Sequence, residues 1–90
     1  MTRQELDAML EERGEQAIVL DDFDDAIDGY VDACGGIRVV YDYEKCIDVL
    51  KQADGMSEED ARVSFEYNTI RALPYMGVLH PLMIHKTWPV

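Results

Sequence analysis

Two adjacent glycines, Gly35 and Gly36, separate two short apolar segments in the centre of the chain. Glycine adopts the positive φ angles that tight hairpin turns require, and the run at 37–41 is typical of a β-strand. We therefore predict an antiparallel β-hairpin with strands at 26–31 and 37–41. A helix at 24–34 is the alternative, because apolar residues recur there at helical spacing, but Gly29 at its centre disfavours it by about 1 kcal/mol.

A helix signal precedes this hairpin. Thr2 and Glu5 have the spacing of a capping box, Leu6 and Leu10 follow one turn apart, and Gly14 is placed to end the helix. We predict a helix at 2–13. The apolar run at 17–20 fits either a strand or a buried connector.

Two further helices are predicted after the hairpin. Asp42 can cap a helix that runs to about residue 53, and Ser57, followed by three acidic residues, starts a helix that Pro74 stops near residue 73. The last helix has two apolar sides, formed by Val63, Tyr67 and Ile70 and by Ala61, Phe65 and Ala72. We therefore expect it to form the centre of the core.

Ninety residues provide room for one small domain, which we take to span residues 1–90. Apolar residues make up 48% of the chain, which argues against intrinsic disorder. We predict a single α+β domain: an N-terminal helix, an antiparallel β-hairpin that a C-terminal strand at 82–85 can join, and two consecutive helices packed on one face of the sheet.

The net charge of −11 is concentrated near the N-terminus. Residues 1–32 contain eleven acidic and two basic residues, whereas residues 61–90 contain one acidic and three basic residues. The negative net charge excludes direct binding to nucleic acid or to an anionic membrane, because both carry negatively charged phosphate groups. No apolar run reaches the roughly 18 residues that span a bilayer, and the N-terminus has no signal-peptide pattern, so we expect a cytoplasmic protein.

Five acidic residues lie within positions 21–28. Such a cluster suggests Ca²⁺, but an EF-hand loop with Gly29 at its sixth position would have Ala26 at the third and Gly35 at the twelfth, where oxygen ligands are required. We therefore predict no metal site and no cofactor.

The acidic residues could instead imitate the phosphates of a nucleic acid and occupy a basic groove of a protein. A solvated face that only aids solubility is the competing interpretation. If the face binds a partner, we expect the contacts to come from Glu11, Glu12, Asp21, Asp22, Asp24, Asp25 and Asp28.

No set of residues indicates catalysis. Cys34 and Cys46 are expected to be free thiols, and Cys46 lies at an inward helical position. His80 and His85 are five residues apart and would lie on opposite faces of a strand, which is unsuited to one metal ion. We therefore predict that the chain is not an enzyme.

The roles of three residues near the C-terminus stay open. We expect Asn68 to be buried in its helix with its amide bonded to the loop after Pro74, although a ligand contact is the alternative. Arg71 follows less than one turn later. Trp88 either packs on the core or is an exposed binding anchor.

Three segments carry a resemblance: VYDYEKCI at 40–47, DGMSEEDA at 54–61 and EYNTIRALPYMG at 66–77. Over about residues 26–85 the chain resembles a group of small, uncharacterised proteins of tailed phages and prophages. Residues 78–80 stand where that group has a short acidic turn before the proline that matches Pro81. The group has no assigned activity, and the resemblance implies an accessory phage protein in a bacterial cytoplasm.

Acidity and resemblance together predict a non-enzymatic protein that binds a basic surface of a host protein. The nucleic-acid groove of a defence nuclease fits this description, which would make the chain a DNA mimic of the anti-CRISPR or anti-restriction type. The alternative is a structural or regulatory phage component that acts as a homo-oligomer through Tyr75, Met76 and the C-terminal tail.

Overall fold

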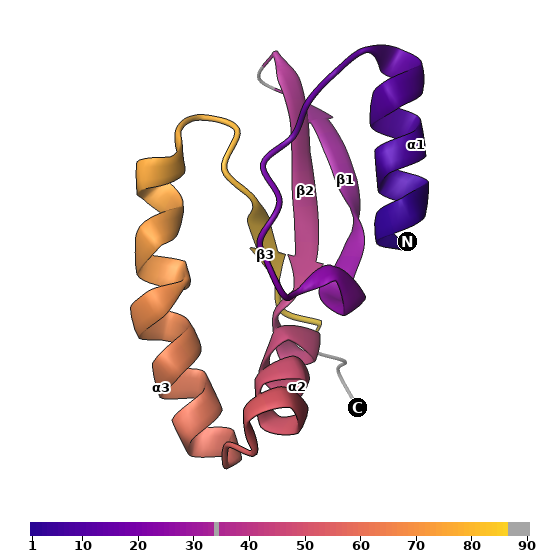
Figure 1. The fold of residues 1–90 in the computed structure, drawn as a ribbon. Coiled ribbons are helices and arrows are strands. Elements are labelled where there is room, and N and C mark those ends of the chain that lie inside the picture. The colour runs from indigo at the N-terminus through magenta and orange to yellow at the C-terminus, as the bar shows by residue number, and fades with distance from the viewer. Residues whose placement is uncertain (34, 87–90) are drawn as a thin grey trace.

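The structure is a computed structural model that describes residues 1–33 and 35–86. Helices and strands are mixed along the chain, which confirms the predicted α+β class (Figure 1). In chain order the elements are α1 (Arg3–Arg13), the 3₁₀ turn η1 (Asp24–Ala26), β1 (Ile27–Ala33), β2 (Gly36–Asp42), α2 (Tyr43–Asp54), α3 (Glu58–Asn68), the 3₁₀ segment η2 (Ile70–Met76) and β3 (Leu82–Ile84).

The sheet has the strand order β1-β2-β3. β1 and β2 are antiparallel, with Ile27 paired to Tyr41 at one end and Ala33 paired to Gly36 at the other. Gly35 has a φ angle of +83° in the turn between them, as the sequence predicts. The hairpin is therefore confirmed, and the alternative helix across this region is wrong. β3 adds to β2 in parallel.

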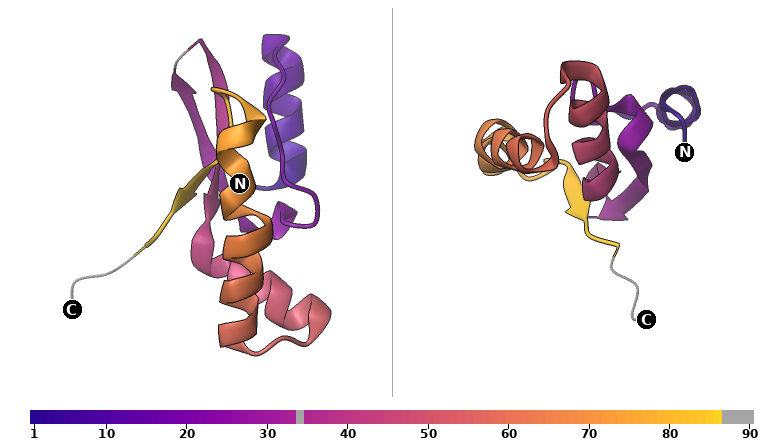
Figure 2. Two further views of the ribbon diagram at one scale, coloured as in Figure 1. Left: turned by 90° about the vertical axis from the view of Figure 1, so that its left-hand side faces the viewer. Right: turned by 90° about the horizontal axis from the view of Figure 1, so that it is seen from below.

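The helices lie on different sides of this sheet (Figures 1 and 2). α1 and the segment that follows it run beside the hairpin, α2 continues from the end of β2, and α3 runs back beyond β3 on the opposite side. A parallel pair such as β2 and β3 requires a long connection of this kind, because the chain must return to the same end of the sheet. The molecule therefore has two outer sides, one formed by α1 and one by α3.

The predicted starts of the three helices and the predicted ends of the first two are confirmed. The side chains of Thr2, Asp42 and Ser57 each accept a hydrogen bond from a backbone N–H in the first turn of the helix that follows. Gly14 and Gly55 end α1 and α2 in the left-handed conformation that glycine adopts without a steric penalty. Local sequence signals thus set where these helices begin and where the first two of them end.

β2 forms the centre of the core. The side chains of Ile37, Val39 and Tyr41 point to one face of the strand and are fully buried. The backbone N–H of Leu20 donates to the Tyr41 hydroxyl at 2.8 Å. This bond fixes the 17–20 run against the sheet as a buried connector and not as a strand.

α3 is shorter than expected. The N–H of Thr69 makes the last α-helical bond, to the carbonyl of Phe65 at 2.9 Å, and the chain continues as the tighter η2. Pro74 has no N–H to donate and its ring would clash with the carbonyl four residues earlier, so an α-helix does not extend through this segment. The predicted helix at 57–73 is therefore two elements.

The expectation that α3 forms the centre of the core is also wrong. Ala61 and Phe65 are buried, but Val63 and Tyr67, on the second apolar side, are 64% and 66% exposed. A helix at the edge of a three-stranded sheet has a single neighbouring layer to pack against, so its other apolar side faces solvent.

Candidate functional site

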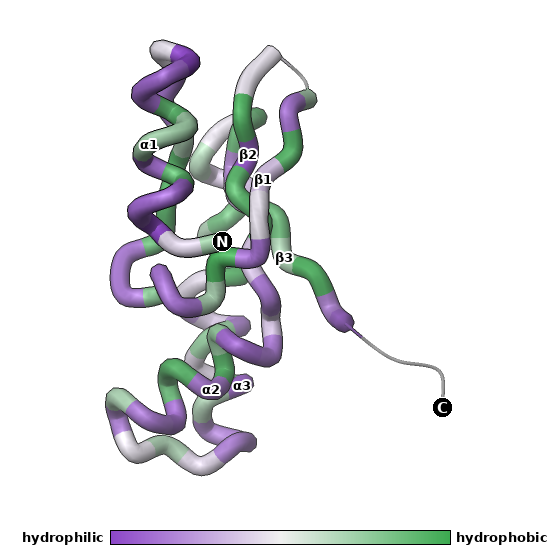
Figure 3. The backbone as a smooth tube through the Cα atoms, turned by 90° about the vertical axis from the view of Figure 1, so that its right-hand side faces the viewer, coloured by the Kyte–Doolittle hydropathy of each residue, from purple (hydrophilic) through white to green (hydrophobic). Residues whose placement is uncertain are grey.

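Six of the seven predicted contact residues are exposed, and five of these form two groups on the α1 side of the molecule. Glu11 and Glu12 lie near the end of α1, and Asp21, Asp22 and Asp25 lie in the turn at 21–25, which we call the acidic turn. α1 and the chain around this turn present hydrophilic residues on the same side (Figure 3). Within the described residues, none of these five carboxylates forms an ion pair.

Asp24 and Asp28, the other two predicted contact residues, are engaged by the fold itself. Arg3 Nη1 donates to Asp24 Oδ1 at 3.1 Å, and Lys86 Nζ donates to Asp28 Oδ1. The bond to Asp28 raises the pKa of the Lys86 ammonium group. These two carboxylates therefore join separate segments of the chain, unlike the five unpaired ones, and their role as partner contacts stays a prediction.

The Arg3–Asp24 pair places the acidic turn beside the N-terminal end of α1. Residues 3 and 11 lie eight positions apart, which corresponds to a rise of about 12 Å along the helix axis. Duplex DNA carries about seven phosphate charges over that length. Five unpaired carboxylates have the right sign but a lower density, so they suit a basic protein surface better than they reproduce a duplex.

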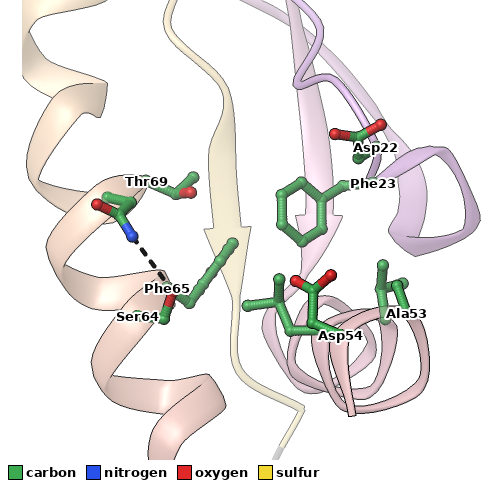
Figure 4. Close-up of a pocket in the computed structure, with 10 residues that line it drawn as sticks. Asp22, Phe23, Ala53, Asp54, Ser64, Phe65 and Thr69 are labelled. Atoms are coloured by element: carbon green, nitrogen blue, oxygen red, sulfur yellow. Dashed lines mark hydrogen bonds between the residues drawn. The ribbon is translucent and has the colours of Figure 1, made fainter. Parts of the chain in front are cut away.

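A pocket of about 520 Å³ opens beside the acidic turn, between α2 and α3 (Figure 4). Its floor is apolar. Phe23 and Phe65 meet edge to face with their ring centroids 5.2 Å apart, and Val49 and Leu50 of α2 line the same pocket. A pocket of this volume with an apolar floor and polar groups at its mouth has the character of a ligand site.

Two carboxylates lie at the mouth of this pocket. Asp22 comes from the acidic turn and Asp54 from the last residue of α2, and both lie near the ring of Phe23 in the view of Figure 4. The φ angle of Asp22 is +71°, in the left-handed region that aspartate tolerates better than most side chains. Strained backbone of this kind is concentrated at binding sites.

Asn68 also lines the pocket, which corrects the expectation that it is buried. Its side chain is exposed, and its Nδ2 donates to the Ser64 hydroxyl at 3.2 Å, one turn earlier in α3. The predicted bond to the loop after Pro74 is not formed among the described residues. Asn68 is the last residue of α3, so the end of that helix contributes its amide to the pocket lining.

This arrangement fits a long cationic side chain from a partner. Lysine and arginine carry an apolar stem below a charged head group. The stem would lie on the phenylalanine floor, and the head group would reach the carboxylates of Asp22 and Asp54. Exclusion of water by the stem would strengthen that ionic contact.

The cysteine and histidine residues considered for catalysis make contacts within the fold itself. Cys46 is fully buried, and burial raises the pKa of its thiol to about 12, so the thiol is protonated at neutral pH. Arg38 Nε donates to the His80 carbonyl at 2.9 Å, and the ring of His85 lies 4.4 Å from that of Tyr43. In the part of the chain that the structure describes, no three His, Cys, Asp or Glu side chains gather as they would to hold a metal ion.

Sequence reasoning missed three polar residues of the pocket, Asp54, Ser64 and Thr69. Asp54 follows the predicted end of the second helix, near residue 53, and no role was expected of it. The available signal was the recurrence of polar residues at 64 and 68, one turn apart and next to the apolar position of Phe65. That pattern indicates a helix side at the boundary between core and solvent, but not which segment faces it.

Comparison of the chain with protein-family models, with curated proteins and with solved structures gives no match. The resemblance to phage proteins therefore stays a prediction. Cys34 and Trp88 lie outside the described residues, so the expectations for them also stay predictions. Across residues 1–33 and 35–86, every helix is too short or too polar to cross a bilayer.

Proposed function

We propose that this chain is a binding protein without catalytic chemistry, which docks its acidic side on a basic groove of a host protein in the bacterial cytoplasm. The observation that carries the proposal is an apolar pocket directly beside the unpaired carboxylates of the acidic turn. Electrostatic attraction would speed the encounter, and a lysine or arginine seated in the pocket would slow dissociation.

The partner class that we favour is a defence nuclease with a groove that binds nucleic acid. Such a groove carries arginine and lysine side chains that neutralise phosphates. Glu11 and Glu12 on α1, together with the acidic turn, offer charges of the same sign along one side of the molecule. By occupying the groove, the chain would block access of the nucleic acid, as an inhibitor of the anti-CRISPR or anti-restriction type does.

Affinity capture from a bacterial lysate, at low and at high salt, tests this proposal. The test variant combines Asp21→Asn, Asp22→Asn and Asp25→Asn, because asparagine also tolerates the left-handed backbone of residue 22. A matched control combines Asp48→Asn, Glu59→Gln and Asp60→Asn, which removes the same charge from exposed positions away from the pocket.

We expect the wild type and the control to retain a nuclease at low salt and to release it at high salt. The acidic-turn variant should retain it at least about tenfold less, since three charged contacts of modest strength are lost. Equal retention by all three forms, or retention that does not change with salt, would contradict the proposal.

A further inference from the structure

The outer side of α3 and η2 exposes a row of large side chains. Val63, Tyr67 and Tyr75 are 64%, 66% and 90% exposed, and the Arg71 guanidinium lies 4.8 Å from the centroid of the Tyr67 ring. These four residues recur every four positions, and we call them the aromatic strip. Isolated apolar residues are common on surfaces, but a continuous row that includes tyrosine and arginine has the composition of an interface.

Two shallow grooves run along this strip and share Tyr67 and Arg71. The first, of about 580 Å³, is also lined by Val63 and Glu66, and the second, of about 480 Å³, ends at Tyr75. The strip is therefore a continuous surface with apolar, cationic and anionic groups side by side.

The surface around the aromatic strip carries charges of both signs. Arg62, Glu66 and Arg71 line its grooves, and three further acidic residues lie in the first turn of α3, at 58–60. Two copies of the chain would repel one another at the α1 side, where five carboxylates are unpaired, whereas the grooves on the α3 side have two arginines and one glutamate among their lining residues. Two copies joined at α3 would have their acidic α1 sides at opposite ends of the pair, because α1 and α3 lie on opposite sides of the sheet (Figure 2).

Arg71 and Glu66 supply the complementary charges. Among the described residues Arg71 pairs with no carboxylate, and Glu66 Oε1 accepts from the Tyr43 hydroxyl at 2.9 Å, which leaves its other oxygen available. A surface that carries an acidic and a basic side chain five residues apart can pair with the same surface of a second copy turned by 180°, because each acidic side chain then faces a basic one.

We propose that the aromatic strip is the interface of a homodimer with twofold symmetry, in which α3 and η2 of two copies lie antiparallel. Tyr67 of each copy packs close to the twofold axis, Glu66 of each copy faces Arg71 of the other, and Tyr75 reaches Val63 of the other copy near the ends of the interface. Met76 is not part of this interface because it packs against the core of its own chain. The proposal is independent of the acidic side, which stays exposed in such a dimer.

Light scattering coupled to size-exclusion chromatography tests the dimer. We expect a wild-type mass of twice 10.3 kDa. The variant Tyr67→Ser/Tyr75→Ser should be a monomer with an unchanged circular dichroism spectrum, because both side chains are exposed. A monomeric wild type at all concentrations up to the millimolar range would overturn the proposal and assign the strip to a different partner.

A charge exchange tests the antiparallel pairing. Arg71→Glu should raise the dimer dissociation constant about tenfold or more, and adding Glu66→Arg should restore it. Lys45→Glu, which makes the same change of charge at an exposed site on α2, is the control and should leave the dimer intact. Failure of the double variant to recover, with the control dimeric, would overturn the pairing.

Discussion

The acidic side and the aromatic strip are both exposed, but the fold uses them differently. On the acidic side, Arg3 pairs with Asp24 at 3.1 Å and Arg13 pairs with Asp32 at 2.9 Å. These pairs join α1 to η1 and to β1. On the aromatic strip, the Arg71 guanidinium lies over the ring of Tyr67, 4.8 Å from its centroid, and pairs with no carboxylate of the described residues. A run of charges in a sequence therefore overstates the surface left for a partner, whereas an apolar helix side that lacks a packing layer is left free for one.

The same contrast occurs within α3, where residues two positions apart have opposite surroundings. Phe65 is 1% exposed and contacts the rings of Phe23 and Tyr43, with centroids 5.2 and 5.4 Å away. Tyr67 is 66% exposed. If Phe65 stabilises the fold and Tyr67 belongs to an interface, a substitution at Phe65 should lower the stability of the single chain, and a substitution at Tyr67 should not.

Phe65→Ala should give the largest effect, a loss of about 3–5 kcal/mol in the free energy of unfolding, because it removes the pocket floor and leaves a cavity in the core. Tyr67→Ala should change that free energy by no more than about 0.5 kcal/mol at concentrations where the chain is monomeric. Urea denaturation followed by circular dichroism measures both. Similar losses at the two positions would remove the distinction between fold and interface.

Tyr41→Phe should cost about 1–3 kcal/mol, because the N–H of Leu20 would stay buried without an acceptor. This substitution tests the connector that leads from α1 to the acidic turn. Tyr75→Phe also removes a tyrosine hydroxyl, but from the aromatic strip, and should leave the free energy of unfolding in urea unchanged. A neutral Tyr41→Phe would show that the connector is not held by this bond.

Stability should fall in alkaline solution because of Cys46. Its pKa is raised from 9.0 to about 12 in the folded chain. Below pH 9 the thiol is protonated in both states, so its contribution to stability is fully present. Above pH 9 the unfolded chain loses the proton first, and stability should fall by about 1.4 kcal/mol per pH unit as the pH rises toward the folded pKa.

Thermal unfolding between pH 8 and pH 11 measures this slope. Cys46→Ala should be less stable than the wild type at pH 8, because a small cavity is created, but above pH 9 its slope should be shallower by the contribution of one proton, so the difference in stability should shrink as the pH rises. A slope unchanged by the substitution would mean that the buried tyrosines account for the alkaline loss.

The smallest of these effects is expected at the N-terminus of α1. Thr2→Ala removes a cap and should cost about 1 kcal/mol. Thr69→Ala at the start of η2 removes no capping bond, since none is formed there, and should cost less. Equal costs in urea denaturation would show that the cap does not anchor the acidic side.

Local signals were enough to predict much of the fold. Thr2, Asp42 and Ser57 mark helix starts, and Gly35 and Gly36 mark the hairpin, because capping and positive φ angles depend on a few adjacent residues. The end of α3 and the burial of its sides were not predicted. They depend on which layers surround the helix, and that is a property of the whole topology.

The candidate site was predicted only in part. Acidic residues are easily identified in a sequence, but the internal pairs of Asp24 and Asp28 join segments far apart in the chain, to Arg3 and to Lys86. The pocket combines a turn with two helices, so no single segment reveals it. The pocket exists because the fold brings Phe23 of the turn against Phe65 of α3, 42 positions later in the chain.

In the proposed function, the unpaired carboxylates beside the apolar pocket bind basic side chains of a partner. Titration of the ¹⁵N-labelled chain with an arginine-rich peptide, followed by amide chemical shifts, tests it most directly. We predict saturable shifts at residues 21–25, 54 and 64–69, lost in the Asp21→Asn/Asp22→Asn/Asp25→Asn variant. Shifts spread evenly over every acidic residue, or confined to the aromatic strip, would contradict the claim.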